Sequence, residues 1–244
     1  MEGIVLVNKK EQKGFALVVA AHPDDEILGC GATAAALASS GWEVQACILS
    51  GQADARRNRP DLPELKRDTM QAQNILGMKA PILGSFPNIK FNTVPHLDLV
   101  QFIEGSIAST GAGVLFTHHP GDLNNDHTQT SRACQAAARL FQRSPGIKPL
   151  RALYFMEILS STDWAFNSAG NPFRPDTFVA VGPYLEKKIE ALRSYKGIIR
   201  DFPHPRSEEI LRGLAALRGG QAGIEYAEAF QTAFRACRSA GEFM

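Results

Sequence analysis

The sequence predicts an α/β domain built on a doubly wound, mostly parallel sheet with helices on both faces. Short apolar runs alternate with longer helical patterns, and glycines stand where two of the helices should end. The 244 residues are 44% apolar and evenly composed, without repeats or low-complexity linkers, so we expect one core and a single domain over 1–244. Strands that alternate with helices favour parallel pairing.

The expected elements follow from these patterns in chain order. Buried strands are predicted at 15–21, 44–50, 81–86, 114–118, 152–158 and 178–182. Helices are predicted at about 27–40, 62–76, 96–109, 127–143, 184–195, 207–218 and 225–238. Gly41 and Gly77 should end the first two helices, because glycine is favoured just past a helix end. The core should occupy about 15–160, and a strand and helices at about 176–240 should complete a pocket beside it.

Charge and cysteine content argue against several classes of function. The net charge of +1 leaves no basic stripe, so nucleic acid is not an expected partner. No apolar run approaches the roughly 18 residues of a membrane helix, which predicts a soluble, cytoplasmic protein with no membrane partner. The cysteines are widely spaced, so we expect reduced thiols rather than disulfides or a thiolate zinc site. Cys30 alone, near a polar cluster at 22–26, stays open as a nucleophile.

Two polar clusters follow predicted strands, at the points where those strands end. The letters HPDDE at 22–26 follow the first strand, and HHPGDLNNDH at 118–127 follows the fourth. In doubly wound sheets the ligand site lies at the carboxyl ends of the strands where the strand order reverses, commonly between the first and fourth strands. The two clusters should therefore meet at this switch point, although about a hundred residues separate them.

The donors in these clusters are typical of a catalytic metal site. His22 and Asp25 stand three residues apart across the turn that opens a helix, so they can face the same side, with His127 as third donor. Two imidazoles and one carboxylate suit zinc with one position left for water, whose pKa zinc can lower to about 7. Asp24 could then act as general base and acid in a hydrolysis that yields an acid and an amine or alcohol.

Two other interpretations compete for the first cluster. Asp24 or Asp25 could cap the helix, and Glu26 is expected only to begin the helix and complement its dipole. A cap alone would leave a histidine and a second carboxylate unexplained. Gly29 and Gly31 begin a pattern similar to a dinucleotide-binding turn, but HPDDEI separates it from the strand and its carboxylates would repel phosphate. Close packing of the helix explains these glycines better.

With AHPDDE after the first strand and HHPGDLNNDH after the fourth, the sequence resembles the LmbE-like or PIG-L family of zinc-dependent N-acetylglucosamine deacetylases. SSTDW, YKG and FPHPRSEE also look like later segments of bacterial members, so the resemblance covers most of the chain. It implies a Rossmann-like fold, hydrolysis of an acetamide on a sugar, and trimers or hexamers. It also implies that His22, Asp25 and His127 hold one zinc or another divalent metal per chain, with Asp24 as general base.

One position departs from the family pattern. Several members carry a histidine three residues before the last ligand, where it stabilises the oxyanion, and this chain has Asn124 there. Either Asn124 donates a weaker hydrogen bond or another residue has taken the role. His204 is our candidate, because two prolines hold its loop extended and Ser207 can cap the next helix. Such a donor would be worth roughly 3–4 kcal/mol; a surface histidine in a turn is the alternative.

The remaining polar residues near the clusters have less specific roles. His119 and Asp122 fit residues that orient the metal ligands. Asp126 either orients a catalytic histidine or caps the helix that follows. His118 can equally be a strand-end residue without a chemical role, and His96 is expected only to start a helix.

Substrate contacts are harder to assign. Arg56 and Arg57, after the second strand, could contact sugar hydroxyls or a phosphate, or be solvated surface residues. Trp164 could stack on a sugar face or pack under a loop. The sequence thus predicts a zinc-dependent N-deacetylase acting on an amino sugar or its conjugate. A metal-dependent amidase or esterase on another acyl substrate is the first alternative, and a non-catalytic sugar- or nucleotide-binding protein is the second.

Overall fold

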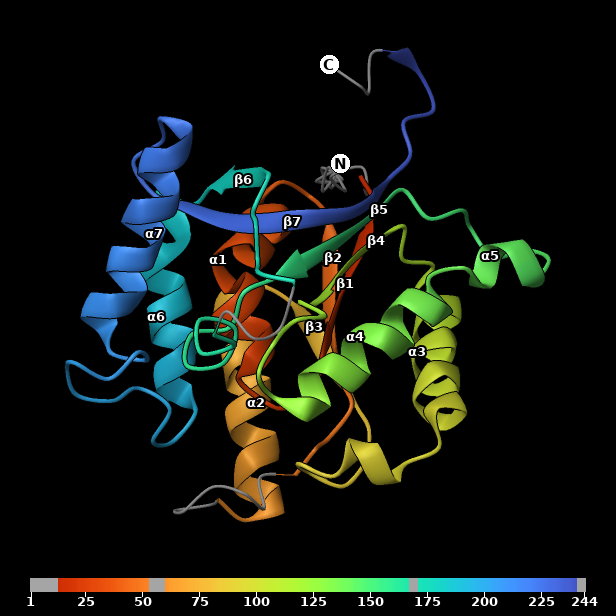
Figure 1. The fold of residues 1–244 in the computed structure, drawn as a ribbon, viewed down its shortest axis with the longest axis horizontal. Helices are drawn as coiled ribbons and strands as arrows, with labels where there is room; N and C mark the ends of the chain where they lie inside the picture. The colour runs from red at the N-terminus through yellow and green to blue at the C-terminus, as the bar shows by residue number, and fades with distance from the viewer. Residues whose placement is uncertain (1–12, 53–59, 167–170, 241–244) are drawn as a thin grey trace, which may run out of the picture.

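One mixed sheet forms the centre of the computed structural model, which describes residues 13–52, 60–166 and 171–240 (Figure 1). Its strands are β1 (Phe15–Ala20), β2 (Glu43–Ile48), β3 (Lys79–Leu83), β4 (Val114–His118), β5 (Ala152–Met156), β6 (Thr177–Ala180) and β7 (Ala227–Arg235). Their order across the sheet is β3-β2-β1-β4-β5-β7-β6. The strands from β1 to β5 pair in parallel, whereas β7 runs antiparallel to both β5 and β6. The predicted mostly parallel, doubly wound sheet is confirmed.

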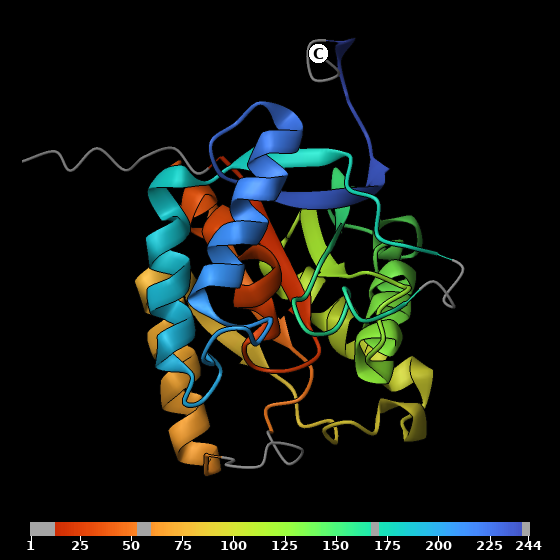
Figure 2. The same ribbon diagram turned by 60° about the vertical axis from the view of Figure 1, so that its left-hand side comes forward.

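Helices cover both faces of this sheet. They are α1 (Asp25–Ser39), α2 (Leu62–Leu76), α3 (His96–Thr110), α4 (Asn125–Ala137), α5 (Leu140–Arg143), α6 (Leu185–Ser194) and α7 (Glu208–Ala222), with 3-10 turns η1 (Phe91–Thr93) and η3 (Gly182–Tyr184). Figure 1 and Figure 2 show α1, α2, α6 and α7 on one side of the sheet and α3 and α4 on the other. No helix in the described ranges is both long and apolar enough to cross a membrane.

The central strand β1 shows how the apolar runs are used. Ala16, Val18 and Ala20 belong to the core on the α1 side, whereas Leu17 and Val19 belong to the core on the α3 side. All five side chains are fully buried. A strand buried on both faces has a continuous apolar sequence, which is why it could be identified without the structure.

The predicted helix at about 225–238 is wrong, because these residues form strand β7. The composition of 225–238, rich in alanine with two glutamates and a glutamine, favours a helix locally. Pairing with β5 on one side and β6 on the other, together with burial of the first half of the strand, overrides that propensity. The predicted helix at 127–143 is also divided, since α4 ends at Ala137 and α5 follows as a separate turn.

Glycines mark helix ends and close packing, as predicted. Gly41, just beyond α1, has a φ of +92°, and Gly77, at the end of α2, has a φ of +72°, both in the region that glycine adopts without strain. A Cβ atom on Gly29 would lie 2.5 Å from Met156 Sδ, and Gly31 is similarly crowded. These last two glycines therefore allow close packing around α1, which supports the packing interpretation over a nucleotide-binding turn.

Candidate metal centre

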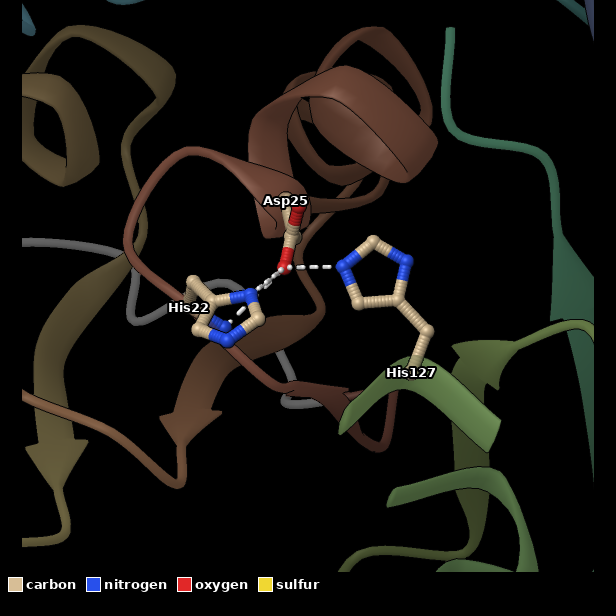
Figure 3. A group of neighbouring side chains, drawn as sticks. All are labelled: His22, Asp25 and His127. Carbon is tan, nitrogen blue, oxygen red and sulfur yellow. Dashed lines mark hydrogen bonds and ion pairs between the residues drawn. The ribbon is translucent and has the colours of Figure 1, made fainter. Parts of the chain in front are cut away.

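The strand order brings the two polar clusters together. β1 pairs with β4 in parallel, so the loops that follow these strands leave the same edge of the sheet. β1 also pairs with β2, which makes the boundary of β1 and β4 the place where the strand order reverses. This predicted arrangement places His22 and Asp25 beside His127, which lies in the first turn of α4 (Figure 3).

Asp25 lies between the two imidazoles (Figure 3). Its Oδ2 atom is 3.2 Å from His22 Nδ1 and 3.1 Å from His127 Nε2. The three residues are at most 8% exposed, and one donor atom from each lies within 4.8 Å of the others. A buried group of this composition can hold a metal ion.

A further carboxylate holds the outer nitrogen of each imidazole. His22 Nε2 lies 2.9 Å from Asp126 Oδ2, and His127 Nδ1 lies 3.1 Å from Asp122 Oδ1. Metal-ligating histidines in proteins almost always donate the other ring N–H to such a partner, which fixes the tautomer and the ring orientation. Both inner nitrogens are thereby directed at the same carboxylate oxygen of Asp25.

The protonation of the imidazoles follows from this arrangement. Burial lowers the pKa of His127, but the carboxylates of Asp25 and Asp122 outweigh burial and raise the pKa to about 10. Burial also acts downward on the pKa of His22, and hydrogen bonds to Asp126 and Asp25 raise it above the ordinary value. Protons on the inner nitrogens thus bridge the imidazoles to Asp25. A divalent cation at this point would satisfy both nitrogens and the carboxylate, so these residues fit a metal.

His118 forms a second possible donor group with Asp122 and His127. Its ring stacks on the ring of His127 with centroids 3.9 Å apart, and its Nε2 accepts a hydrogen bond from the Ala21 N–H at 2.8 Å. Burial lowers the pKa of His118 to about 3, so the ring stays neutral. Because the Nε2 lone pair accepts the backbone N–H and Nδ1 carries the proton of the neutral ring, neither nitrogen of His118 offers a lone pair to a metal, and the group around Asp25 fits a metal better. His118 nevertheless does more than end a strand, since it supports the His127 ring.

Asp24 precedes α1 in a conformation that L residues rarely adopt. Its φ is +99°, and it is only 3% exposed. The side chain makes no capping hydrogen bond, so the capping interpretation is wrong for this residue. Its Oδ2 lies 3.3 Å from Arg206 Nη1, and its backbone N–H donates to Glu26 Oε2 at 3.0 Å. The strained backbone and these two contacts fix where the Asp24 carboxylate lies.

Glu26 does more than begin a helix, which corrects the expectation from the sequence. It is fully buried, and its Oε1 accepts hydrogen bonds from Gln73 Nε2 at 2.9 Å and from the Tyr195 hydroxyl at 2.6 Å. Burial raises the pKa of Glu26 to about 8. Glu26 thus ties the start of α1 to α2 and to the end of α6. The sequence carried no signal for this role, because both partners lie far along the chain.

Arg206 is a site residue that the sequence did not indicate. Its Nε donates to Ser160 Oγ at 2.8 Å, and its Nη1 approaches Asp24 Oδ2. The guanidinium therefore bridges the segment after β5 and the loop after β1. It lies in PHPRSEE, where the two prolines flank His204. A single arginine in such a segment does not by itself predict a role in the site.

His204 lies in the same loop as Arg206, and its side chain is exposed. Its Nδ1 accepts a hydrogen bond from the Arg206 N–H at 3.0 Å, so the proton of the neutral ring is on Nε2. Burial and the positive charges of Arg200 and Arg206 lower the pKa of His204, which favours the neutral form. Ser207 caps α7 as predicted, with Oγ accepting from the Ile210 N–H. An oxyanion role for His204 stays a prediction.

The loop after β4 supplies the remaining carboxylate contacts. Asn124 caps α4, since its Oδ1 accepts from the Asp126 N–H at 2.9 Å, which leaves the Asp126 carboxylate for His22. Asp122 accepts hydrogen bonds from Thr162 Oγ1 at 2.6 Å and from the Ser161 hydroxyl, besides contacting an imidazole. The two hydroxyl donors were not identified from the sequence.

Two other predicted histidines have structural contacts. His119 is buried and packs edge-on against Phe155 with centroids 5.8 Å apart, and its Nδ1 accepts from the Gly121 N–H at 3.1 Å. These contacts hold the loop after β4 in place. They do not orient an imidazole of the candidate metal centre, so the predicted orienting role of His119 is wrong. His96 is exposed and begins α3, as predicted.

The predicted substrate contacts are only partly covered by the structure. Trp164 is 49% exposed and contacts Phe166 edge-on, so it is not packed under a loop. Arg56 and Arg57 lie outside the described residues.

Three of the cysteines are unsuited to nucleophilic catalysis. Cys30, Cys47 and Cys134 are fully buried, and no disulfide joins the cysteines in the described ranges. Burial raises the pKa of the Cys30 thiol well above its ordinary value, and the pKa values of Cys47 and Cys134 to about 12. A buried thiol with a raised pKa forms little thiolate, which argues against Cys30 as a catalytic nucleophile.

The chain is similar to known deacetylases over much of its length. Residues 17–138, half of the chain, match the model of the family described as PIG-L: GlcNAc-PI de-N-acetylase, and this segment contains both polar clusters. The uncharacterized deacetylase YaiS of Escherichia coli (strain K12) is 25% identical over 205 residues, which cover 80% of this chain and 97% of YaiS.

Solved structures share the fold. GalB, the 4-carboxy-2-hydroxymuconate hydratase from Pseudomonas putida KT2440, matches with a TM-score of 0.75 and 22% identity, covering 93% of this chain and 98% of GalB. The N,N'-diacetylchitobiose deacetylase from Pyrococcus horikoshii matches with a TM-score of 0.71 and 16% identity, covering 90% of this chain and 83% of that protein. At these identities the likeness establishes the fold, and the chemistry has to be argued from the site.

Proposed function

Because this chain belongs to the PIG-L family of deacetylases, we propose that it is a zinc-dependent hydrolase that removes the acetyl group from an N-acetylated amino sugar or its conjugate. The observation that carries the proposal is the convergence of two buried imidazoles on Asp25, with Asp24 held beside them in a strained conformation. Backbone strain persists only where the surrounding structure enforces it, and it clusters at active sites. The donor set also accepts iron, manganese or cobalt, so zinc is the first metal to test.

The metal would be held by His22, Asp25 and His127. Bound there, it would supply the chemistry of polarising the acetyl carbonyl and activating water. Asp126 and Asp122 would keep the two imidazoles in the orientation that presents their inner nitrogens to the metal.

Proton transfer would fall to Asp24. Its carboxylate would accept a proton from the attacking water and return it to the leaving amine. Arg206, anchored on Ser160, would hold that carboxylate in position. The negative charge that develops on the carbonyl oxygen needs a donor, and two are available: His204 through Nε2, and Asn124 through the amide NH₂, since only its Oδ1 is used in capping.

The experiment measures metal content and acetate release. We expect about one metal per chain, and acetate release from N-acetylglucosamine conjugates that a chelator abolishes and zinc restores. Asp24→Asn should retain the metal and lose about 10²–10⁴-fold in kcat, because general base catalysis contributes this much. Asp98→Asn, an exposed acidic residue in the first turn of α3, is the matched control and should behave as the parent.

Each alternative has its own outcome in this experiment. Normal turnover by a metal-loaded Asp24→Asn would reject the proposed base. Turnover confined to non-sugar acetamides or esters would favour the alternative hydrolase. Tight sugar or nucleotide binding that survives the chelator, with no turnover of any substrate, would favour a binding protein.

A further inference from the structure

Exposed apolar side chains gather on the loops that carry the candidate metal centre. Ten large apolar residues are exposed in the described ranges, and half of them lie on these loops. These five, between 46% and 67% exposed, are here called the apolar rim: Ile89, Leu123, Trp164, Phe166 and Phe202. Single exposed apolar residues are normal, but a group of them on the loops around one site is typical of a surface that binds an apolar partner or ligand.

Two members of the apolar rim stand on segments joined at Asp122. Leu123 follows Asp122 directly, and the Asp122 carboxylate holds the His127 ring. Trp164 lies two residues after Thr162, which donates to the same carboxylate at 2.6 Å. Both side chains therefore belong to loops that also build the metal centre.

Phe202 belongs to the loop between α6 and α7. Arg206 of this loop reaches both Asp24 and Ser160, so the loop contacts the proposed base and the segment that carries Trp164. Figure 1 and Figure 2 show this loop, the segment after β5 and the loop after β1 together in the lower half of the molecule.

Ile89 lies on the loop after β3. It lies two residues before Phe91, whose N–H donates to Asp126 at 2.9 Å and whose ring centroid is 6.0 Å from that of His22. Ile89 and Phe166 have φ values of +57° and +48°, which L side chains rarely adopt. The structure thus keeps two apolar side chains exposed on strained backbone, as is common where a ligand binds.

We infer that the substrate carries an apolar group, an alkyl or aryl aglycone, beside the acetamido sugar, and that the apolar rim binds this group. The inference rests on the proposed function. The sugar and its acetamide match the buried polar centre, whereas the rim offers uncharged side chains, including the edge-on pair of Trp164 and Phe166 at 5.7 Å. A ligand that is polar at one end and apolar at the other satisfies both. A flat protein partner would cover the rim and leave the buried centre without a ligand.

The test uses the zinc-loaded full chain and the methyl, butyl and octyl β-glycosides of N-acetylglucosamine, kept below micelle-forming concentrations. Acetate release gives kcat and KM for each glycoside. We expect kcat/KM to rise at least about tenfold from methyl to octyl, since each methylene that the rim buries should contribute about two- to fourfold. Most of the gain should appear in KM, because the rim does not touch the reacting atoms.

Matched variants locate the effect. Phe202→Ala and Trp164→Ala should each lower the octyl-to-methyl ratio of kcat/KM about threefold or more. Phe234→Ala is the control, because Phe234 is also exposed but lies far from the rim. It pairs with Leu153 near the amino end of β5, whereas the candidate metal centre lies at the carboxyl ends of the parallel strands. This variant should keep the parent ratio.

The outcomes separate this inference from the proposed function. A parent ratio near one, or a ratio that Phe234→Ala lowers as much as Phe202→Ala does, would overturn the inference while deacetylation stands. Calorimetric titration of the methyl and octyl glycosides into Asp24→Asn measures binding without turnover. Tighter octyl binding there, with no acetate released by the parent from any glycoside, would support the rim and contradict deacetylation. Equal binding of both glycosides, with self-association that Phe202→Ala abolishes, would overturn the inference in favour of a second copy.

Discussion

Two groups of buried charged residues contact helix α1, and they differ in how their charges are balanced. In the first, Lys188 Nζ lies 2.7 Å from Glu228 Oε1 and also donates to the Leu28 carbonyl. Glu228 accepts hydrogen bonds from the backbone N–H groups of Ala32 and Thr33. One cation meets one anion, and the helix backbone supplies their further partners.

The second group lies at the start of α1 and has an excess of carboxylates. Asp25, Asp122 and Asp126 meet the imidazoles of His22 and His127, which are mostly neutral at pH 7 in unfolded chains. The group is therefore negative unless protons or a cation are added. Burial of charge alone does not distinguish a functional group from a structural one, whereas an excess of buried carboxylates around two imidazoles favours a functional site.

Removal of the carboxylate shared by the imidazoles should have the largest effect. Asp25→Ala should lower the bound metal from about one per chain to near zero and acetate release to background, because two imidazoles alone make a poor zinc site. Elemental analysis after dialysis and the acetate assay measure both, with Asp98→Ala as the control. Full metal retention by Asp25→Ala would move the metal to another group, with His118, Asp122 and His127 as the next to examine.

Disruption of the balanced pair should change stability rather than chemistry. Lys188→Met should lower the free energy of unfolding by about 3–5 kcal/mol, because Glu228 is left buried without its cation. The double variant Lys188→Met with Glu228→Gln should recover at least half of that loss, since glutamine is neutral and can still accept a backbone N–H. Urea unfolding measures the stability, and folded protein should keep its metal content. A loss below about 1 kcal/mol in the single variant would show that the pair contributes as little as a surface ion pair.

Loss of an outer carboxylate should have a smaller effect on the metal than loss of Asp25. Asp126→Asn should weaken metal affinity about 10–100-fold, because the His22 ring loses the partner that orients it. Asparagine can still accept from the Phe91 N–H, so the fold should be preserved. Competition with a chromophoric chelator gives the affinity. Unchanged affinity would mean that Asp126 only links η1 to α4.

The smallest expected effect is a difference in the labelling rates of two thiols. Cys30 lies on α1 between the two groups, and burial raises its pKa well above the ordinary value. In native protein at pH 8, Cys30 should react with a disulfide reagent at least about tenfold more slowly than half-buried Cys237, because the thiolate is the reacting form. Mass spectrometry identifies which cysteine is labelled. Equal rates at Cys30 and Cys237 in the parent would contradict the burial described for α1.

The candidate metal centre could be located from the sequence because its donor residues occupy two short segments that each follow a buried strand. The alternation of strands and helices indicated that the ends of the first and fourth strands meet, so HPDDE and HHPGDLNNDH could be joined without coordinates. Glu26 and Arg206 could not be assigned in this way. The partners of Glu26, Gln73 and Tyr195, come from distant helices, and Arg206 reaches Asp24 only through the path of its loop.

Strand β7 was missed for a different reason. Local composition favours a helix there, and only the open edges of β5 and β6 determine that the segment is extended. The residues of one segment do not show whether a distant strand has an unpaired edge with which that segment can pair. The same limit explains why Glu228, on β7, gave no sign of its pairing with Lys188.

The position of β7 has a consequence for how the chain is made. Roughly seventy residues separate the end of β5 from the start of β7, yet β7 lies between β5 and β6 in the sheet. At about 5–20 residues per second, a chain under synthesis leaves β5 with an open edge for several seconds, when pairing with another chain is a hazard. By then the segments that carry His22, Asp25 and His127 have all been synthesised. The donor residues of the candidate metal centre are thus available before the strand that closes the sheet, and β5 stays open to pairing with another chain until β7 has been made.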